Sequence, residues 1–128
     1  MKGRALVLLI AVALLSGMTA YGHHSFAATY MEDKTITIEG KLVQFMFRNP
    51  HSFVHILDAK GVRWGVEWGG AGQLGGQGVT RESLKPGDYV IVSGNPGRNS
   101  ADNRIRMQTL RRPSDGFGWG QRPGEVVD

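Results

Sequence analysis

Hydrophobic and polar residues alternate along most of the chain between residues 35 and 110. The alternation is clearest over residues 35–45 and 62–68, where apolar or β-branched side chains recur at every second position. A period of two places successive side chains on opposite faces of a β-strand. Gly40 interrupts the first run, which we interpret as a bulge in one long strand. We therefore predict five strands, over residues 35–45, 52–57, 62–68, 89–93 and 104–110.

Turn-forming residues separate these predicted strands. Residues 58–61 and 83–88 contain the Asp, Gly and Pro residues that favour tight turns. Residues 69–78 contain six glycines, which disfavour a helix by propensity, although Leu74 and Val79 would anchor a short one. Three strands, a short helix or loop and two more strands follow the order of a five-stranded OB-like barrel. The sequence thus predicts an all-β fold with at most one short helix, and a β-sandwich is the alternative.

The first 22 residues have the pattern of a secretory signal peptide. A short cationic start precedes an apolar run over residues 5–15 and then small polar residues. The run is shorter than the roughly 20 residues that span a bilayer, although an uncleaved anchor is the alternative. Cleavage after Gly22 would leave a chain that begins at His23, located in a bacterial periplasm or secreted, without a stable membrane anchor.

After the signal segment we expect one domain over residues 23–112 and a flexible tail rich in Gly and Pro over residues 113–128. The composition of this domain excludes several kinds of chemistry. The 128 residues include no cysteine, so disulfides, thiolate zinc sites and thiol nucleophiles are excluded. Removing the two basic residues of the signal segment lowers the formal net charge from +4 to +2. With export, this small charge argues against a nucleic-acid partner, and we expect a periplasmic partner or a small ligand.

All four histidines lie in two short segments, namely His23 and His24 at the predicted mature terminus and His51 and His55 around the second strand. An α-amine and imidazoles lose their protons to a metal readily at neutral pH. Ligand sets rich in nitrogen favour copper(II) among the divalent first-row ions. We therefore predict a copper site formed by His23, His24 and His51.

Two coordination modes are open to this terminus. His24 can bind through its imidazole and backbone amide together with the amine of His23, which needs no folded protein. Alternatively, the amine and imidazole of His23 hold the metal and His51 completes a T-shaped set, as in the histidine brace of copper monooxygenases. His55 lies about 13 Å from His51 along a strand, too far to share one ion. A solvated or hydrogen-bonded role for the histidines, without metal, is the plainer alternative.

Further side chains have candidate supporting roles. Asn49 or Glu67 would orient a metal-binding imidazole from behind. Trp64 and Trp68 share one face of a predicted strand and would stack on a carbohydrate or other small ligand if they lined an exposed groove. The sequence has no G-x-S-x-G, H-E-x-x-H or phosphate-loop motif. It therefore favours a binding or interaction module over an enzyme, and a copper redox enzyme is the remaining enzymatic alternative.

Four motifs follow one another along the chain: His-His-Ser-Phe-Ala-Ala at residues 23–28, Asn-Pro-His at 49–51, Trp-Gly-Val-Glu at 64–67 and Ser-Leu-Lys-Pro-Gly-Asp at 83–88. Together they resemble a family of exported bacterial proteins catalogued as domain of unknown function 6152. The resemblance covers roughly residues 23–110 and implies an exported single domain with an OB-like barrel, without naming an activity. His55 is not one of the family's motif positions. The motif positions are His23, His24, Ser25, Phe26, Asn49, Pro50, His51, Trp64 and Glu67.

Overall fold

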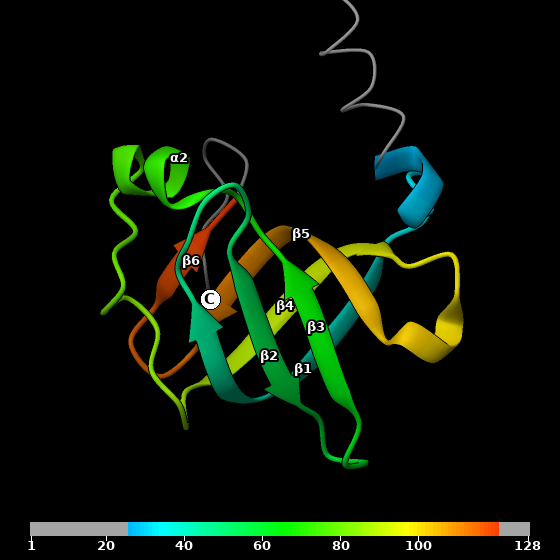
Figure 1. Ribbon diagram of the computed structural model, residues 1–128. Coiled ribbons are helices and arrows are strands. Elements are labelled where there is room, and N and C mark those ends of the chain that lie inside the picture. Colours follow the sequence, from blue (N-terminus) through cyan, green and yellow to red (C-terminus); the bar gives the residue numbers. More distant parts are fainter. Residues whose placement is uncertain (1–25, 121–128) are drawn as a thin grey trace, which may run out of the picture.

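Strands dominate the structure, a computed structural model that describes residues 26–120. The predicted signal peptide, His23 and His24 lie outside the described residues. After a helical turn at residues 26–29, the elements follow in the order drawn in Figure 1. They are β1 (Ile36–Met46), β2 (Phe53–Leu57), β3 (Arg63–Glu67), α2 (Ala71–Gly76), β4 (Tyr89–Pro96), the 3-10 turn η1 (Ser100–Asp102), β5 (Arg104–Arg112) and β6 (Phe117–Trp119).

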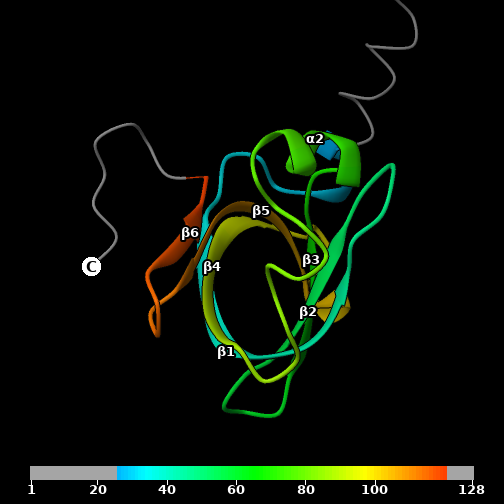
Figure 2. The same ribbon diagram turned by 90° about the vertical axis from the view of Figure 1, so that its left-hand side faces the viewer.

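Five of the strands close into a small barrel, which confirms the predicted all-β fold. The sheet order is β3-β2-β1-β4-β5-β6, and a parallel pairing between β3 and β5 closes the ring. Figure 2 shows the ring end-on, with β6 attached outside it along β5. All other pairings are antiparallel. The seam between β3 and β5 joins segments far apart in the sequence, and the candidate site lies on it.

Strand β1 is long because it pairs with two neighbours. It runs antiparallel to β2 on one side and to β4 on the other. The register with β2 shifts between Leu42 and Gln44, so the bulge that the sequence placed at Gly40 lies further along the strand. Gly40 serves a different purpose: a Cβ atom there would overlap the carbonyl oxygen of Leu57. The glycine therefore permits a close approach of the two backbones.

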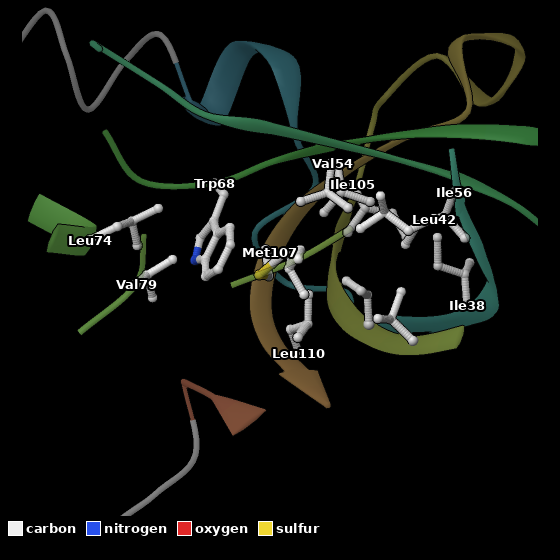
Figure 3. Packing of buried hydrophobic residues seen from close by; sticks show 14 residues of the cluster. Ile38, Leu42, Val54, Ile56, Trp68, Leu74, Val79, Ile105, Met107 and Leu110 are labelled. Carbon is white, nitrogen blue, oxygen red and sulfur yellow. The ribbon is translucent and has the colours of Figure 1, made fainter. Parts of the chain in front are cut away.

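The inward-facing side chains form a continuous core (Figure 3). Trp68 follows β3 and lies between the barrel and the α2 region, with its indole ring directed toward Leu74 and Val79. Leu74 is fully buried, which explains why a helix rich in glycine forms here: its anchor contributes about 2–5 kcal/mol, the usual cost of truncating a buried leucine. The core residues are Ile38, Leu42, Val54, Ile56, Val66, Trp68, Leu74, Val79, Leu84, Val90, Val92, Ile105, Met107 and Leu110.

Two short elements differ from the sequence prediction. Part of the segment assigned to a flexible tail, Phe117–Trp119, forms β6 and pairs with β5. The ring of Trp119 packs edge-on against Trp68 at 5.3 Å between centroids. The local sequence pattern does not predict this contact. The helical turn at residues 26–29 is a second short helix where at most one was expected. Within residues 26–120 no helix is long and apolar enough to cross a bilayer.

Candidate functional site

The parallel seam between β3 and β5 gathers charged side chains on the outside of the barrel. Its register pairs Gly65 with Arg104 and Glu67 with Arg106. Glu67 follows the inward-facing Val66 and therefore points away from the core. The guanidinium Nη2 of Arg104 lies 3.4 Å from Oε1 of Glu67. Glu67 is nevertheless only 9% exposed, so another part of the chain must cover it.

That cover is supplied by residues 26–30. Tyr30 is 1% exposed although it does not belong to the barrel core, and Arg104 lies over its ring at 5.6 Å from the centroid. Phe26 stacks on His51 with 5.5 Å between centroids and 12° between planes. The guanidinium of Arg106 lies 4.0 Å from the centroid of the same Phe26 ring. Phe26 is thus in contact with an imidazole and a cation, a favourable arrangement for an aromatic ring.

Hydrogen bonds fix the helical turn in this place. The backbone amide of Arg98 donates to the carbonyl of Thr29 at 2.9 Å, and its Nε donates to the carbonyl of Ala27 at 2.6 Å. Tyr30 forms an isolated β-bridge with Gly97. Because these partners belong to the loop after β4, the turn is attached to the barrel at several points.

His51 is held by a loop that is fastened to the start of α2. Ser52, which is fully buried, donates its amide to Gly69 and accepts from Trp68, which extends the pairing of β2 and β3 by one residue. The amide oxygen of Asn49 accepts from the backbone of Gly72 at 3.1 Å. Asn49 therefore anchors α2, and its oxygen is engaged there instead of with an imidazole. The backbone position of His51 is fixed from both sides.

His51 and Glu67 are neighbours in the structure. Nδ1 of His51 lies 3.7 Å from Oε1 of Glu67, and 38% of the histidine side chain is exposed. Among the described residues Nε2 has no protein partner. A carboxylate on one side of an imidazole and an open nitrogen on the other is the arrangement that commonly orients a metal-binding histidine. Of the two candidates for orienting an imidazole, Glu67 is therefore the one that lies beside His51, and its role toward a metal stays a prediction.

A pocket of about 280 Å³ opens beside His51 at one end of the barrel. It lies between the helical turn and α2, which share this end in both Figure 1 and Figure 2. Aromatic rings from three elements line it, namely Phe26, Trp68 and Trp119. Polar groups also line it, namely His51, Glu67, Gln73 and Arg106.

The two tryptophans proposed for stacking are separated. Trp68 lines the pocket but is 4% exposed, and its indole nitrogen has no hydrogen-bond partner within the described residues. Trp64 lies at the opposite end of β3, where its Nε1 donates to a carboxylate oxygen of Asp58 at 3.0 Å. This hydrogen bond lowers the pKa of Asp58. Trp64 was predicted to line a groove together with Trp68. The second tryptophan at the pocket is instead Trp119, which lies in the segment assigned to a tail.

Burial shifts the pKa values of Tyr30 and His55. Burial raises the pKa of the Tyr30 phenol, and the negative charge of Glu67 raises it further. His55 lies on β2 outside the pocket, and burial together with Arg63 lowers its pKa. Arg104 and Arg106 were not assigned to the site from sequence because their proximity to Glu67 depends on the seam between β3 and β5. Tyr30 was not assigned because it reaches the site only through its attachment to the loop after β4.

The described residues contain no group of three His, Asp or Glu side chains arranged to hold a metal ion. His51 and Glu67 supply two such groups, and His23 and His24 lie outside residues 26–120.

Comparison with known proteins places the chain in a family. A search of curated proteins found no match. The model of the "Family of unknown function (DUF6152)" matches residues 11–106. This range covers well over half of the chain and includes Phe26, His51, Glu67 and both arginines of the seam. The chain therefore belongs to the family of unknown function DUF6152.

Proposed function

We propose that this protein is an exported copper-binding module whose metal site joins His51 to His23 and His24. The observation that carries the proposal is the stacking of Phe26 on His51, with 5.5 Å between ring centroids. It places the described beginning of the chain against the imidazole. The signal peptide, which would expose His23 by cleavage after Gly22, is part of the proposal.

Chain length supports this arrangement. His24 precedes Phe26 by two residues and His23 by three. An extended residue spans at most about 3.6 Å, so these residues lie within roughly 7 to 11 Å of Phe26 along the backbone. Imidazole side chains add further reach. The amine and side chain of His23 can therefore meet His51 without any displacement of the barrel.

The surroundings of His51 favour a ligand role. Glu67 lies 3.7 Å from its Nδ1, which leaves Nε2 for the metal. Nitrogen ligands from the imidazoles of this site and the α-amine of His23 favour copper(II) over the other divalent first-row ions. The resulting function is copper binding, and nothing in the sequence identifies a substrate for redox catalysis.

Native mass spectrometry of the untagged chain, expressed with its own leader and supplied with copper, tests the proposal. We expect a mass that begins at His23 and carries one copper ion. His51→Ala should weaken copper binding by about tenfold or more. His55→Ala is the matched control because His55 lies outside the pocket, and it should bind copper like the wild type.

Three outcomes would overturn the proposal. A mature chain that begins elsewhere would remove the α-amine from the site. A chain that stays free of metal would exclude copper binding and favour an interaction module with a periplasmic partner. Equal affinity in both alanine variants would show a local chelate of His23 and His24 that does not use His51.

A further inference from the structure

We propose that the pocket between the helical turn at residues 26–29 and α2 binds an uncharged sugar ring. The inference concerns a second ligand beside the copper site and does not require a metal. It rests on the shape of the pocket, on the pairing of its charges and on the polar atoms that remain without a partner.

The walls of the pocket suit a molecule the size of one ring. Trp119 offers a half-buried ring that meets the buried ring of Trp68 almost at right angles, with 79° between their planes, and Phe26, also half-buried, contributes a further ring from another element. Small-ligand pockets usually enclose about 300–1,000 Å³, and this one measures about 280 Å³. One ring fits this space, while a longer ligand would extend into solvent. Aromatic faces bind the apolar C–H faces of sugar rings as they bind other apolar surfaces.

Charge pairing disfavours a charged organic ligand. Glu67 has Arg104 and His51 beside its Oε1. Arg106 forms an ion pair with Glu32 at 3.2 Å and contacts the ring of Phe26. A charged organic ligand would have to compete with one of these partners, which would leave a charge of the protein without its own partner. The site therefore favours a neutral molecule.

Two polar groups that line the pocket are free to form hydrogen bonds with the hydroxyl groups of a ligand. Oε2 of Glu67 accepts no hydrogen bond from residues 26–120, and the exposed amide of Gln73 has no partner there either. A hydroxyl group donates to the first and either donates to or accepts from the second. An apolar aromatic ligand would displace water from these atoms without replacing its hydrogen bonds, at a cost in binding. A sugar ring matches the polar atoms and the aromatic walls together.

Saturation-transfer NMR on the mature chain, kept free of copper by a chelator, tests the inference. The probes are glucose, galactose, mannose and N-acetylglucosamine at millimolar concentration. We expect at least one to bind, with transfer from aromatic protons of Phe26 or Trp119. Trp119→Ala should weaken binding about tenfold, which corresponds to 1.4 kcal/mol, and Gln73→Ala should weaken it several-fold.

Matched controls keep the test decisive if Trp119→Ala disturbs β6. Gln73 and Gln44 are both exposed glutamines, and only Gln73 lines the pocket, so Gln44→Ala should bind the sugar like the wild type. Glucuronate and glucosamine carry a charge that the pocket cannot pair, and they should bind more weakly than their neutral counterparts. Tighter binding of either charged sugar would overturn the inference. So would the absence of binding by all four probes, or equal affinities in the two glutamine variants.

The outcome is separable from that of the copper proposal. Sugar binding is measured without copper, and copper binding is measured without sugar. A chain that binds sugar but no copper supports this inference alone, and the reverse result supports the copper proposal alone.

Discussion

Strand β5 carries a cluster of arginine, carboxylate and aromatic side chains at each end, and the two clusters differ in how completely they are paired. The Arg112 cluster consists of Arg112, Asp88, Asp115 and Phe117 at the end of the strand. The Glu67 cluster consists of Glu67, Arg104, Arg106, His51 and Phe26 and lies at its beginning. Their residue types are similar, while their geometry is not.

The Arg112 cluster is saturated. Arg112 donates two hydrogen bonds to Asp115 at 2.8 and 2.9 Å, one to Asp88 at 2.7 Å and one to the carbonyl of Ser83 at 2.8 Å. Its guanidinium also lies over the ring of Phe117. Only 15% of the arginine side chain is exposed. All three guanidinium nitrogens donate hydrogen bonds, so the cluster joins β5, β6 and the turn before β4.

The Glu67 cluster is looser. Its contacts to Glu67 measure 3.4 and 3.7 Å, and Arg104, Arg106 and His51 each keep more than a third of their side chains exposed. Such pairs contribute little to stability, and the cluster borders the pocket. The tight pairing of the Arg112 cluster indicates a structural role, whereas the looser pairing of the Glu67 cluster beside a cavity is what a binding role would require.

The largest effect is expected at the saturated end. Arg112→Met keeps much of the aliphatic stem but leaves Asp88 and Asp115 without their donor. Because hydrogen bonds to charged groups are the stronger ones, the free energy of unfolding should fall by about 2–3 kcal/mol. Urea unfolding followed by circular dichroism measures this loss. Copper and sugar binding should stay unchanged in native conditions. A loss below about 0.5 kcal/mol, the range of ordinary surface substitutions, would contradict the structural role.

A smaller change in stability is expected at the open end. Glu67→Gln keeps the shape of the side chain and should lower the free energy of unfolding by less than about 1 kcal/mol. Copper affinity should fall about tenfold, because the imidazole of His51 loses the carboxylate that orients it. Competition with a chelating dye measures the affinity, and Glu82→Gln is the control on an exposed turn. A large loss of stability with unchanged affinity would reverse the comparison.

The smallest effect concerns pH at the saturated end. Arg112 lowers the pKa of Asp115 below its ordinary value of 3.8. A carboxylate whose pKa is lowered by folding stabilises the fold fully above the ordinary value and loses this contribution as pH falls through the lowered one. Asp115→Asn should therefore have a lower Tm than the wild type at neutral pH. The two Tm values should converge well below pH 3.8, as thermal melts across that range will show. A constant difference at all pH values would mean that the charge of Asp115 is not involved.

Local patterns in the sequence predicted most of the barrel. The alternation over residues 62–68 predicted β3, and the Pro-Gly turn before Tyr89 predicted the beginning of β4. These features depend on neighbours along the chain, because strand periodicity and turn chemistry are properties of a few consecutive residues. The motifs also named His51 as a candidate ligand and Glu67 or Asn49 as a candidate for orienting an imidazole, but which of the two lies beside His51 came from the fold. The roles of His23 and His24 stay predictions.

Tertiary structure alone decided how the site is assembled. The parallel pairing of β3 with β5 brings Arg104 beside Glu67, although 37 residues separate them in the sequence. Trp64 and Trp68 share a period of two, yet only Trp68 reaches the pocket, because the helical turn and α2 both pack at its end of β3. Trp119 also lines the pocket, and it comes from β6, a strand that the glycines and prolines of this segment did not predict. The sequence by itself therefore determined the strands of the barrel and the chemical groups available for a site. The closure of the barrel decided which of these groups come into contact, because contacts between residues distant in the sequence depend on the whole fold.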